Sequence, residues 1–335
     1  MHSSISRQHL DCSCLGRAGF GRYRLRHGMG VQAVKCWLIA GALLATALPA
    51  FADWQSRDSN YNQNIVAAGG SYTGPGDVVS GAKMWWGLRA YSLATVGTKA
   101  ANICNSGDAN CADVNTLSNG DFDVATATGA PLNCGGAGGT CTIKVLYDKI
   151  GINCAAANCD LTQTTIANRP TLVFNCVGTK PCASFNGTSQ RIISGGSATS
   201  VSQPVTLSAV AINNNTGAQR SILFFAGNTL QIAYSSANNA QLFAGSNRGA
   251  AASTSAFHAL QGVANGASSD INIDGTANTG TAGSNALSGT ISMGDNGGSS
   301  QWFNGGITEA GAWPSAFSSG QSSSMSSNQH SYWGF

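Results

Sequence analysis

The sequence predicts an all-β protein built as a β-sandwich or jelly roll. Short apolar runs of strand length recur along the chain, with Gly, Asn, Asp or Pro between them. No long stretch shows the 3.6-residue period of an amphipathic helix. Six of the eleven cysteines fall within Cys134–Arg191, in three short-range pairs. The 42% apolar content argues against a disordered chain and for strands packed around a core.

Residues 1–52 are predicted to be a leader that contains a secretory signal peptide. Basic residues precede the apolar run Trp37–Leu48, and Ala50 and Ala52 form a small-x-small cleavage pattern. We expect the mature chain to start near Asp53 and to be secreted or periplasmic, with no membrane attachment after cleavage. An N-terminal membrane anchor is the alternative, although the run is shorter than the roughly 18 apolar residues that span a bilayer. Met29 is a more ordinary start for such a peptide.

Removal of the leader changes the charge of the chain. The whole sequence carries 17 Lys and Arg against 14 Asp and Glu, and the leader holds six of the basic and one of the acidic residues. The mature part therefore has 11 basic against 13 acidic residues, and the basic ones are scattered. This pattern offers no stripe for phosphates, so we expect no nucleic-acid partner.

Cysteine usage also indicates export. Three cysteines belong to the leader, which leaves an even number, and an even number in an exported chain implies disulfides. Eight cysteines allow 105 connectivities, of which nearest-neighbour pairing is the simplest. A zinc site is the alternative, but the mature chain has only two histidines and no paired C-x-x-C units. We therefore expect no metal and no cofactor. The eight are Cys104, Cys111, Cys134, Cys141, Cys154, Cys159, Cys176 and Cys182.

Two regions follow the leader in this interpretation. Residues 53–81 are polar and Gly-rich and are predicted to form an N-terminal arm, and residues 82–335 a single β-sandwich domain. The segment Ala82–Leu93 is rich in aromatic residues, which fit either a helical face or a strand. We favour a short helix or an irregular segment packed on the sheet. Trp86 within it has two alternatives, stacking on a sugar or filling the core.

Regular strands are expected beyond the cysteine-rich stretch. The run Pro204–Ile212 alternates between two faces, and Asp274-Gly275 is a strong signal for a two-residue hairpin turn. The Ser-rich segment Phe317–Trp333 is expected to be a short helix that closes the end of the chain. The other expected strands are Ser221–Ala226, Leu230–Tyr234, Gln241–Phe243, Phe257–Val263, Ile271–Ile273, Thr290–Met293 and Gly306–Trp313.

Several segments together resemble the catalytic domain of the arabinofuranosidase B family. They are W-G-L-R-A-Y-S at Trp86–Ser92, V-L-Y-D-K-I-G at Val145–Gly151, L-T-Q-T-T-I-A-N-R-P-T-L-V at Leu161–Val173, F-N-G-T at Phe185–Thr188 and the stretch Gly294–Ser315. The resemblance covers most of Ala82–Ser315. It implies a concanavalin A-like, laminin-G-like jelly-roll sandwich of two sheets, here with disulfide-stapled loops.

The resemblance also implies a chemistry. Members are retaining glycoside hydrolases, which need two carboxylates about 5–5.5 Å apart. Asp295 matches the family's acid/base aspartate, although Asp-Asn-Gly is also an ordinary turn sequence. Gln231 stands where the family has its nucleophilic glutamate, and an amide cannot replace that carboxylate. Asp148, at a predicted strand end, is the candidate second carboxylate. Asn296, Trp302, Gln231 and Trp86 are the candidate substrate-binding residues.

Other acidic residues have structural explanations. Glu309 is the one glutamate of the chain and lies on the last apolar strand, where we expect it to pair with an arginine or to cap a loop. Asp121 and Asp123 offer oxygen ligands of the kind that calcium prefers, but solvated loop positions are the simpler interpretation. The mature chain has two histidines, His258 and His330, but the sequence contains no G-x-S-x-G motif that would indicate Ser/His/Asp catalysis.

The sequence thus leaves two functions open. The first is an α-L-arabinofuranosidase that removes arabinofuranosyl residues from plant polysaccharide. The second is a catalytically silent sandwich that binds glycan or serves a structural role at the surface. For a hydrolase and for a glycan-binding sandwich alike, the expected partner is a polysaccharide or another glycan.

Overall fold

The computed structural model describes residues 71–335, except for 155–156, 216, 253–254 and 299. These residues belong to a compact unit that spans Val66–Phe335. The predicted leader and most of the predicted arm lie outside the described residues. Within the described part, no helix is long and apolar enough to cross a membrane.

The first layer of the fold is an antiparallel sheet centred on β20. Strand β11 pairs with β20 on one side and with β16 on the other, and β17 and β18 extend this edge. Both β1 and β9 pair with β20 on its opposite side, each along a different part. The bounds are β1 Met84–Gly87, β9 Lys180–Asn186, β11 Val205–Asn213, β16 Phe257–Ala264, β17 Ser269–Ile273, β18 Thr276–Gly280 and β20 Asn304–Trp313.

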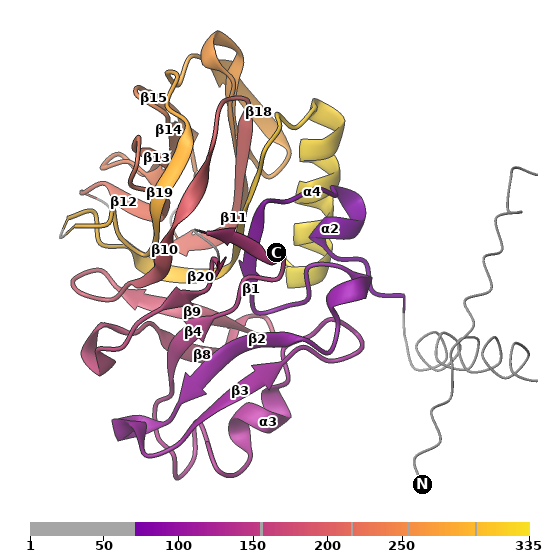
Figure 1. Ribbon diagram of the computed structural model, residues 1–335, viewed down its shortest axis with the longest axis vertical. Coiled ribbons are helices and arrows are strands. Elements are labelled where there is room, and N and C mark those ends of the chain that lie inside the picture. Colours follow the sequence, from indigo (N-terminus) through magenta and orange to yellow (C-terminus); the bar gives the residue numbers. More distant parts are fainter. Residues whose placement is uncertain (1–70, 155–156, 216, 253–254, 299) are drawn as a thin grey trace, which may run out of the picture. The chain divides into compact units, whose positions relative to one another are not determined.

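The second layer is an antiparallel sheet in the order β15–β14–β13–β12–β19–β10. Its apolar face, which includes Leu223, Ile232 and Leu242, is buried in the main core between the layers. The bounds are β10 Ile192–Val201, β12 Arg220–Phe225, β13 Leu230–Tyr234, β14 Asn239–Phe243, β15 Asn247–Ala251 and β19 Leu287–Met293. The prediction of an all-β sandwich is therefore confirmed (Figure 1).

The cysteine-rich stretch joins the two layers at one end. Strand β10 pairs with β5 and β7, β7 pairs with β4, and β4 pairs with β2 and touches β8, which leads through β9 back to β20. The bounds are β2 Lys99–Cys104, β3 Cys111–Asn115, β4 Thr142–Leu146, β5 Ile152–Cys154, β6 Ala157–Asn158, β7 Leu161–Thr162 and β8 Thr171–Val177.

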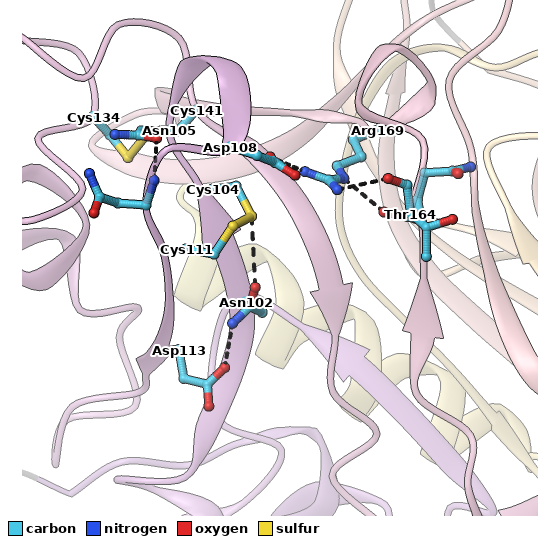
Figure 2. The surroundings of a disulfide bond; sticks show 12 residues. Asn102, Cys104, Asn105, Asp108, Cys111, Asp113, Cys134, Cys141, Thr164 and Arg169 are labelled. Carbon is cyan, nitrogen blue, oxygen red and sulfur yellow. Dashed lines mark hydrogen bonds and ion pairs between the residues drawn. A yellow bond between two sulfur atoms is a disulfide. The ribbon is translucent and has the colours of Figure 1, made fainter.

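Four disulfides staple this joining region, and each links nearest neighbours in the sequence as predicted. The pairs are Cys104–Cys111, Cys134–Cys141, Cys154–Cys159 and Cys176–Cys182. Figure 2 shows the first of them where β2 and β3 meet, close to the second. Since each bridge closes a loop of only a few residues, the bridges fix local turns rather than long-range topology.

The expectation for Ala82–Leu93 was wrong, because this segment contains strand β1. Its four residues pair with β20 from Met84 opposite Ala312 to Gly87 opposite Glu309. Trp86 faces the main core, while Trp85 belongs to a second apolar cluster on the other side of the sheet. A strand that is buried on both faces has a continuous apolar run, and periodicity alone cannot separate such a run from a helix.

The turn predicted at Asp274-Gly275 is present. It connects β17 to β18 with Ile273 opposite Thr276, and both turn residues have positive φ, 53° at Asp274 and 87° at Gly275. This is the geometry of a two-residue hairpin turn that asparagine, aspartate and glycine tolerate best.

The predicted C-terminal helix is confirmed as α4, Ser319–Trp333. Ser318 caps its first turn by accepting from the amide of Gln321, and Gly334 ends it in the left-handed region. The helix lies beside α2 and covers the outer face of the β20 sheet (Figure 1). The remaining helices are α2 Pro75–Val78 and α3 Val124–Thr128, with 3-10 turns η1 Leu93–Thr95, η2 Ser106–Asp108, η3 Ile166–Asn168 and η4 Gly266–Ser268.

A buried polar network attaches α4 to the sheet. Gln329 donates from Nε2 to Glu309 Oε1 at 2.9 Å and to Ser208 Oγ at 3.1 Å, and it accepts from Gln261 at 2.8 Å. Arg89 donates to both oxygens of Glu309, and both side chains are completely buried. The prediction that Glu309 pairs with an arginine is thus confirmed. A Ser-rich helix with few apolar residues is fixed here by hydrogen bonds to the sheet.

We predict that Glu309→Ala is strongly destabilising, because it leaves the Arg89 charge buried without a partner. Loss of one partner of a buried pair costs about 3–5 kcal/mol. Urea denaturation of the disulfide-intact protein measures this change. Lys99→Ala is the matched control: Lys99 pairs with Asp113 but is 58% exposed, so its loss should cost less than about 1 kcal/mol. Equal losses for the two variants would contradict the assigned role of Glu309.

Candidate functional site

Asp295 lies in the turn that follows β19 and is completely buried. Its Oδ2 accepts from Nη1 of Arg191 at 2.8 Å. Its Oδ1 accepts from the hydroxyl of Ser292 and from the amide of Gly297, the latter at 3.0 Å. The bond to Gly297 closes an Asx-turn, the local structure that Asp-Asn-Gly favours. Asp295 therefore forms the turn and also pairs with Arg191.

Arg191 is the residue of this site that sequence reasoning missed. It immediately precedes β10, 104 positions before its carboxylate partner, so no local pattern indicates the pairing. Its side chain is 26% exposed, and the guanidinium lies 5.7 Å from the ring centre of Trp302. Asn296 and Trp302 are half-buried in the same loop. Arg191, Asn296 and Trp302 thus form a partly exposed surface over a buried carboxylate.

Gln231 lies on the same sheet face as Ser292. It is opposite Phe224 on β12, and Phe224 is opposite Ser292 on β19, so the three side chains share one face. Gln231 is therefore two strands from Ser292, or about 10 Å at the usual strand spacing. Gln231 is buried, and its side chain is an amide. The structure brings Gln231, Asn296 and Trp302 into the region of Asp295.

Several buried polar atoms in this region have no hydrogen-bond partner among the described residues. They are Gln231 Oε1, Ser221 Oγ, Asn296 Oδ1 and Gln301 Oε1. Ser221 is opposite Ala233 on the Gln231 face, and its amide donates to the carbonyl of Gln301. Buried polar groups are nearly always paired with protein, water or ligand. Two of these atoms belong to the turn that carries Asp295, and two belong to the neighbouring strands β12 and β13, so the interior of this region is polar.

Asp148 is held in a different environment. Its carboxylate accepts from the backbone amides of Trp85 at 3.0 Å, Ile150 at 3.1 Å and Cys159 at 3.4 Å. Burial raises the pKa of Asp148 to about 6, although these three hydrogen bonds oppose the shift. Asp148 and Asp295 share no hydrogen-bond partner. The contacts of Asp148 join three chain segments and do not connect it to the Asp295 region.

A cavity of about 340 Å³ lies beside Asp148 and was not predicted from the sequence. Burial lowers the pKa of Lys149 to about 7 and raises the pKa of Asp160. The Lys149 ammonium is directed at oxygens of Thr98 and Lys99, and Asp160 accepts from the amide of Asp148 at 2.8 Å. These side chains hold the turn after β4.

Trp86 has the core-filling role of its two alternatives. It is completely buried, and its Nε1 donates to the carbonyl of Cys159 at 2.7 Å. A side chain without exposed surface cannot stack on a sugar, so its inclusion among the substrate-binding residues needs correction. The motif itself gave no way to separate the alternatives, because the burial of β1 comes from apolar clusters on both of its faces.

The remaining acidic candidates have protein partners. Asp123 caps α3 by accepting from the amide of Thr126 at 3.0 Å, and Asp121 pairs with Lys180 at 2.6 Å. Asp274 binds both His258, at 2.5 Å, and His330, at 3.0 Å. Burial favours a higher pKa for Asp274, but the two histidines and a backbone amide outweigh it and lower the pKa. This arrangement connects the β17–β18 turn to the end of α4.

One group of residues with metal-ligand chemistry lies close together in the described part of the chain. It consists of Cys104, Asp108 and Cys111. Figure 2 shows that the two sulfurs are bonded to each other and that Asp108 points at Arg169. A disulfide offers no thiolate, and the carboxylate is engaged by a guanidinium, so this group does not fit a metal ion.

The fold is that of a concanavalin A-like sandwich of the arabinofuranosidase type. A GH54 α-L-arabinofuranosidase soaked with a cyclic sulfate inhibitor superposes with a TM-score of 0.57 at 16% identity. An arabinofuranosidase complexed with arabinofuranosyl-α-1,2-xylobiose superposes with a TM-score of 0.56 at 17% identity. Each match covers 76% of this chain and 64% of the other. The chain matches no family model and no curated protein sequence. The fold implied by the sequence resemblance is thus confirmed.

We predict that Asp148 makes the stability of the protein fall as pH rises from about 4 to 6. The unfolded side chain loses its proton near pH 3.9, whereas the folded one keeps it to about pH 6. Between these values the folded state binds more protons, so the free energy of unfolding decreases as pH increases. Relative to Asp148→Asn, the wild type should lose on the order of 2 kcal/mol between pH 4 and 7. Urea denaturation at several pH values measures the difference, and parallel profiles would contradict it.

Proposed function

We propose that this chain is an exported carbohydrate-active protein that binds arabinofuranosyl-bearing plant polysaccharide at the Asp295 region without hydrolysing it. The binding surface consists of Arg191, Asn296 and Trp302. The arabinofuranosidase-type fold supports the carbohydrate class. The resemblance of the sequence to arabinofuranosidase B and the ligand of one structural neighbour, arabinofuranosyl-α-1,2-xylobiose, support the substrate class.

The observation that carries the proposal is the state of the Asp295 carboxylate. It has no exposed surface, and it accepts hydrogen bonds from Arg191, Ser292 and Gly297. A general acid must carry a proton and reach the oxygen that leaves. The Asp295 carboxylate has no exposed surface with which to reach that oxygen, and its oxygens are already engaged by Arg191, Ser292 and Gly297. Its role in this proposal is to orient Arg191.

Gln231 supports the same conclusion. Retaining hydrolysis needs a second carboxylate about 5–5.5 Å from the first. Gln231, two strands from Ser292 on the same sheet face, carries an amide instead. An amide donates and accepts hydrogen bonds but does not form a glycosyl ester. Among the described residues, no other carboxylate shares a hydrogen-bond partner with Asp295. This favours recognition of hydroxyl groups over attack on an anomeric carbon.

The surface around Arg191 has the groups that sugar recognition needs. The indole of Trp302 offers an apolar face, and the guanidinium of Arg191 offers several donors in a fixed plane. The half-buried side chain of Asn296 adds an amide to this surface. A pentose presents both an apolar ring face and hydroxyl groups, so it matches this combination.

Export is part of the proposal. The apolar run and the small-x-small pattern before Asp53 are typical of a signal peptide. Four disulfides in a chain of this size are typical of an oxidising compartment. A secreted or periplasmic location would place the protein where plant polysaccharide is found.

Two assays on the purified mature protein test the proposal. We expect no release of nitrophenol from 4-nitrophenyl arabinofuranoside by the wild type or by Asp295→Asn. We expect arabinoxylan in a native gel to retard the wild type. Trp302→Ala should weaken this binding about fivefold, or about 1 kcal/mol, and Trp302→Phe should restore part of it.

The opposite pattern would establish the other candidate function. Turnover by the wild type that is lost in Asp295→Asn would identify a hydrolase with Asp295 as a catalytic residue. Unretarded migration in arabinoxylan and in other plant polysaccharides would contradict the glycan partner itself. Circular dichroism of each variant shows whether a loss reflects unfolding.

A further inference from the structure

A second cavity lies away from the Asp295 region. It has a volume of about 600 Å³ and is formed by the start of the described chain, the turn before α3, one end of β9 and the last turns of α4. None of its lining residues belongs to the Asp295 region. Its main lining residues are Tyr72, Asn119, Asp121, Lys180, Asn328 and Tyr332.

We propose that this cavity is a second carbohydrate subsite, which takes a neutral sugar unit. The inference rests on the proposed function for its ligand class, but it concerns separate residues. A polysaccharide chain that contacts both the cavity and the Arg191 surface would gain affinity from the linked contacts.

A rigid wall forms one side of the cavity. Two cations contact the ring of Tyr332. The Arg89 guanidinium lies 4.5 Å from the ring centre, and the Lys180 ammonium lies 4.1 Å from it. The Tyr332 hydroxyl donates to Asp121 at 2.7 Å, and the ring meets Tyr72 edge to face. Behind this wall, Arg89 is fixed by its buried ion pair with Glu309. Side chains fixed in this way lose little entropy when a ligand binds.

The charges of the lining favour a neutral ligand. Lys180 and Asp121 are 2.6 Å apart, so the single positive and single negative side chain of the cavity neutralise each other. The carboxylate of Asp121 would repel an anion, and the ammonium of Lys180 would repel a cation. Both side chains keep exposed surface, 24% for Lys180 and 35% for Asp121. A donor and an acceptor side by side match sugar hydroxyls, each of which donates and accepts.

Side-chain amides extend this polar lining. Asn119 is exposed and donates to Asp121 Oδ2 at 3.1 Å. Asn328 donates to the carbonyl of Thr73 at 2.7 Å, while its Oδ1 has no hydrogen-bond partner among the described residues. The set of amide, carboxylate, ammonium and hydroxyl groups is the chemistry that binds a polyol.

Blocking the cavity tests the proposal. Ser331 is exposed and lines it, so Ser331→Trp should fill the space without removing a core contact. Ser323→Trp is the matched control, since Ser323 is also exposed on α4 but does not line the cavity. Lys180→Gln is a second variant, which removes the ammonium and keeps similar length. Circular dichroism checks that each variant is folded.

Calorimetric titration with arabinotriose and xylotetraose is the measurement. We expect about two sites per wild-type molecule for one of these probes, and one site for Ser331→Trp. Ser323→Trp should match the wild type, and Lys180→Gln should weaken the cavity site about fivefold. Trp302→Ala should keep the cavity site, and the double variant Ser331→Trp with Trp302→Ala should bind neither probe.

Each other outcome has a defined meaning. A single site that is lost in Trp302→Ala and kept in Ser331→Trp would overturn the cavity proposal and leave the proposed function standing. A single site lost only in Ser331→Trp would support the cavity and contradict binding at Arg191. If the titration heats show no binding of either probe to the wild type, both the cavity proposal and the proposed function would be contradicted.

Discussion

The buried ion pair between Arg89 and Glu309 is the interaction on which this structure depends most. Glu309 lies in the middle of β20, the strand that pairs with β1, β9 and β11. Arg89 comes from the segment directly after β1, 220 positions earlier. Neither side chain is exposed, so each charge would carry a large desolvation cost without the other. The pair also accepts a bond from Gln329, which connects the outer helix to the sheet.

Both candidate binding regions are positioned by this arrangement. The turn that carries Asp295 and the half-buried Trp302 leads into β20 at Asn304, so pairing of β20 fixes one end of the loop. On the other side of the sheet, Arg89 packs against the ring of Tyr332, which forms a wall of the cavity of about 600 Å³. A chain with one glutamate uses it for architecture, and the site near Asp295 contains a buried aspartate and an amide. The chemistry that remains at the surface is hydrogen bonding and aromatic contact.

The sequence was most informative where local chemistry decides the structure. Short cysteine spacings predicted the four disulfides, Asp274-Gly275 predicted a hairpin turn, and the Ser-rich segment Phe317–Trp333 predicted the C-terminal helix. The pairing of Glu309 was also predictable in kind, because a lone carboxylate on an apolar strand needs a cationic partner. These features depend on a few neighbouring residues, or on the need of a buried carboxylate for a cationic partner.

The sequence was least informative where distant segments meet. Met84–Gly87 is a strand only because β20 is beside it and apolar clusters cover both faces. Arg191 reaches Asp295 across 104 positions, and Asp148 is occupied by amides from two separate segments as well as its own. Local sequence patterns do not indicate contacts between distant segments. For this reason the two aspartates were candidates for one site, whereas their hydrogen-bond partners place them in different environments.

A crystal structure of the protein soaked with arabinofuranosyl-α-1,2-xylobiose tests the central claim most directly. The account predicts an intact glycosidic bond, a sugar ring against Trp302 and Arg191, and Asp295 still bonded to Arg191. A cleaved ligand, with the Asp295 carboxylate turned from Arg191 toward the position of the leaving oxygen, would contradict it.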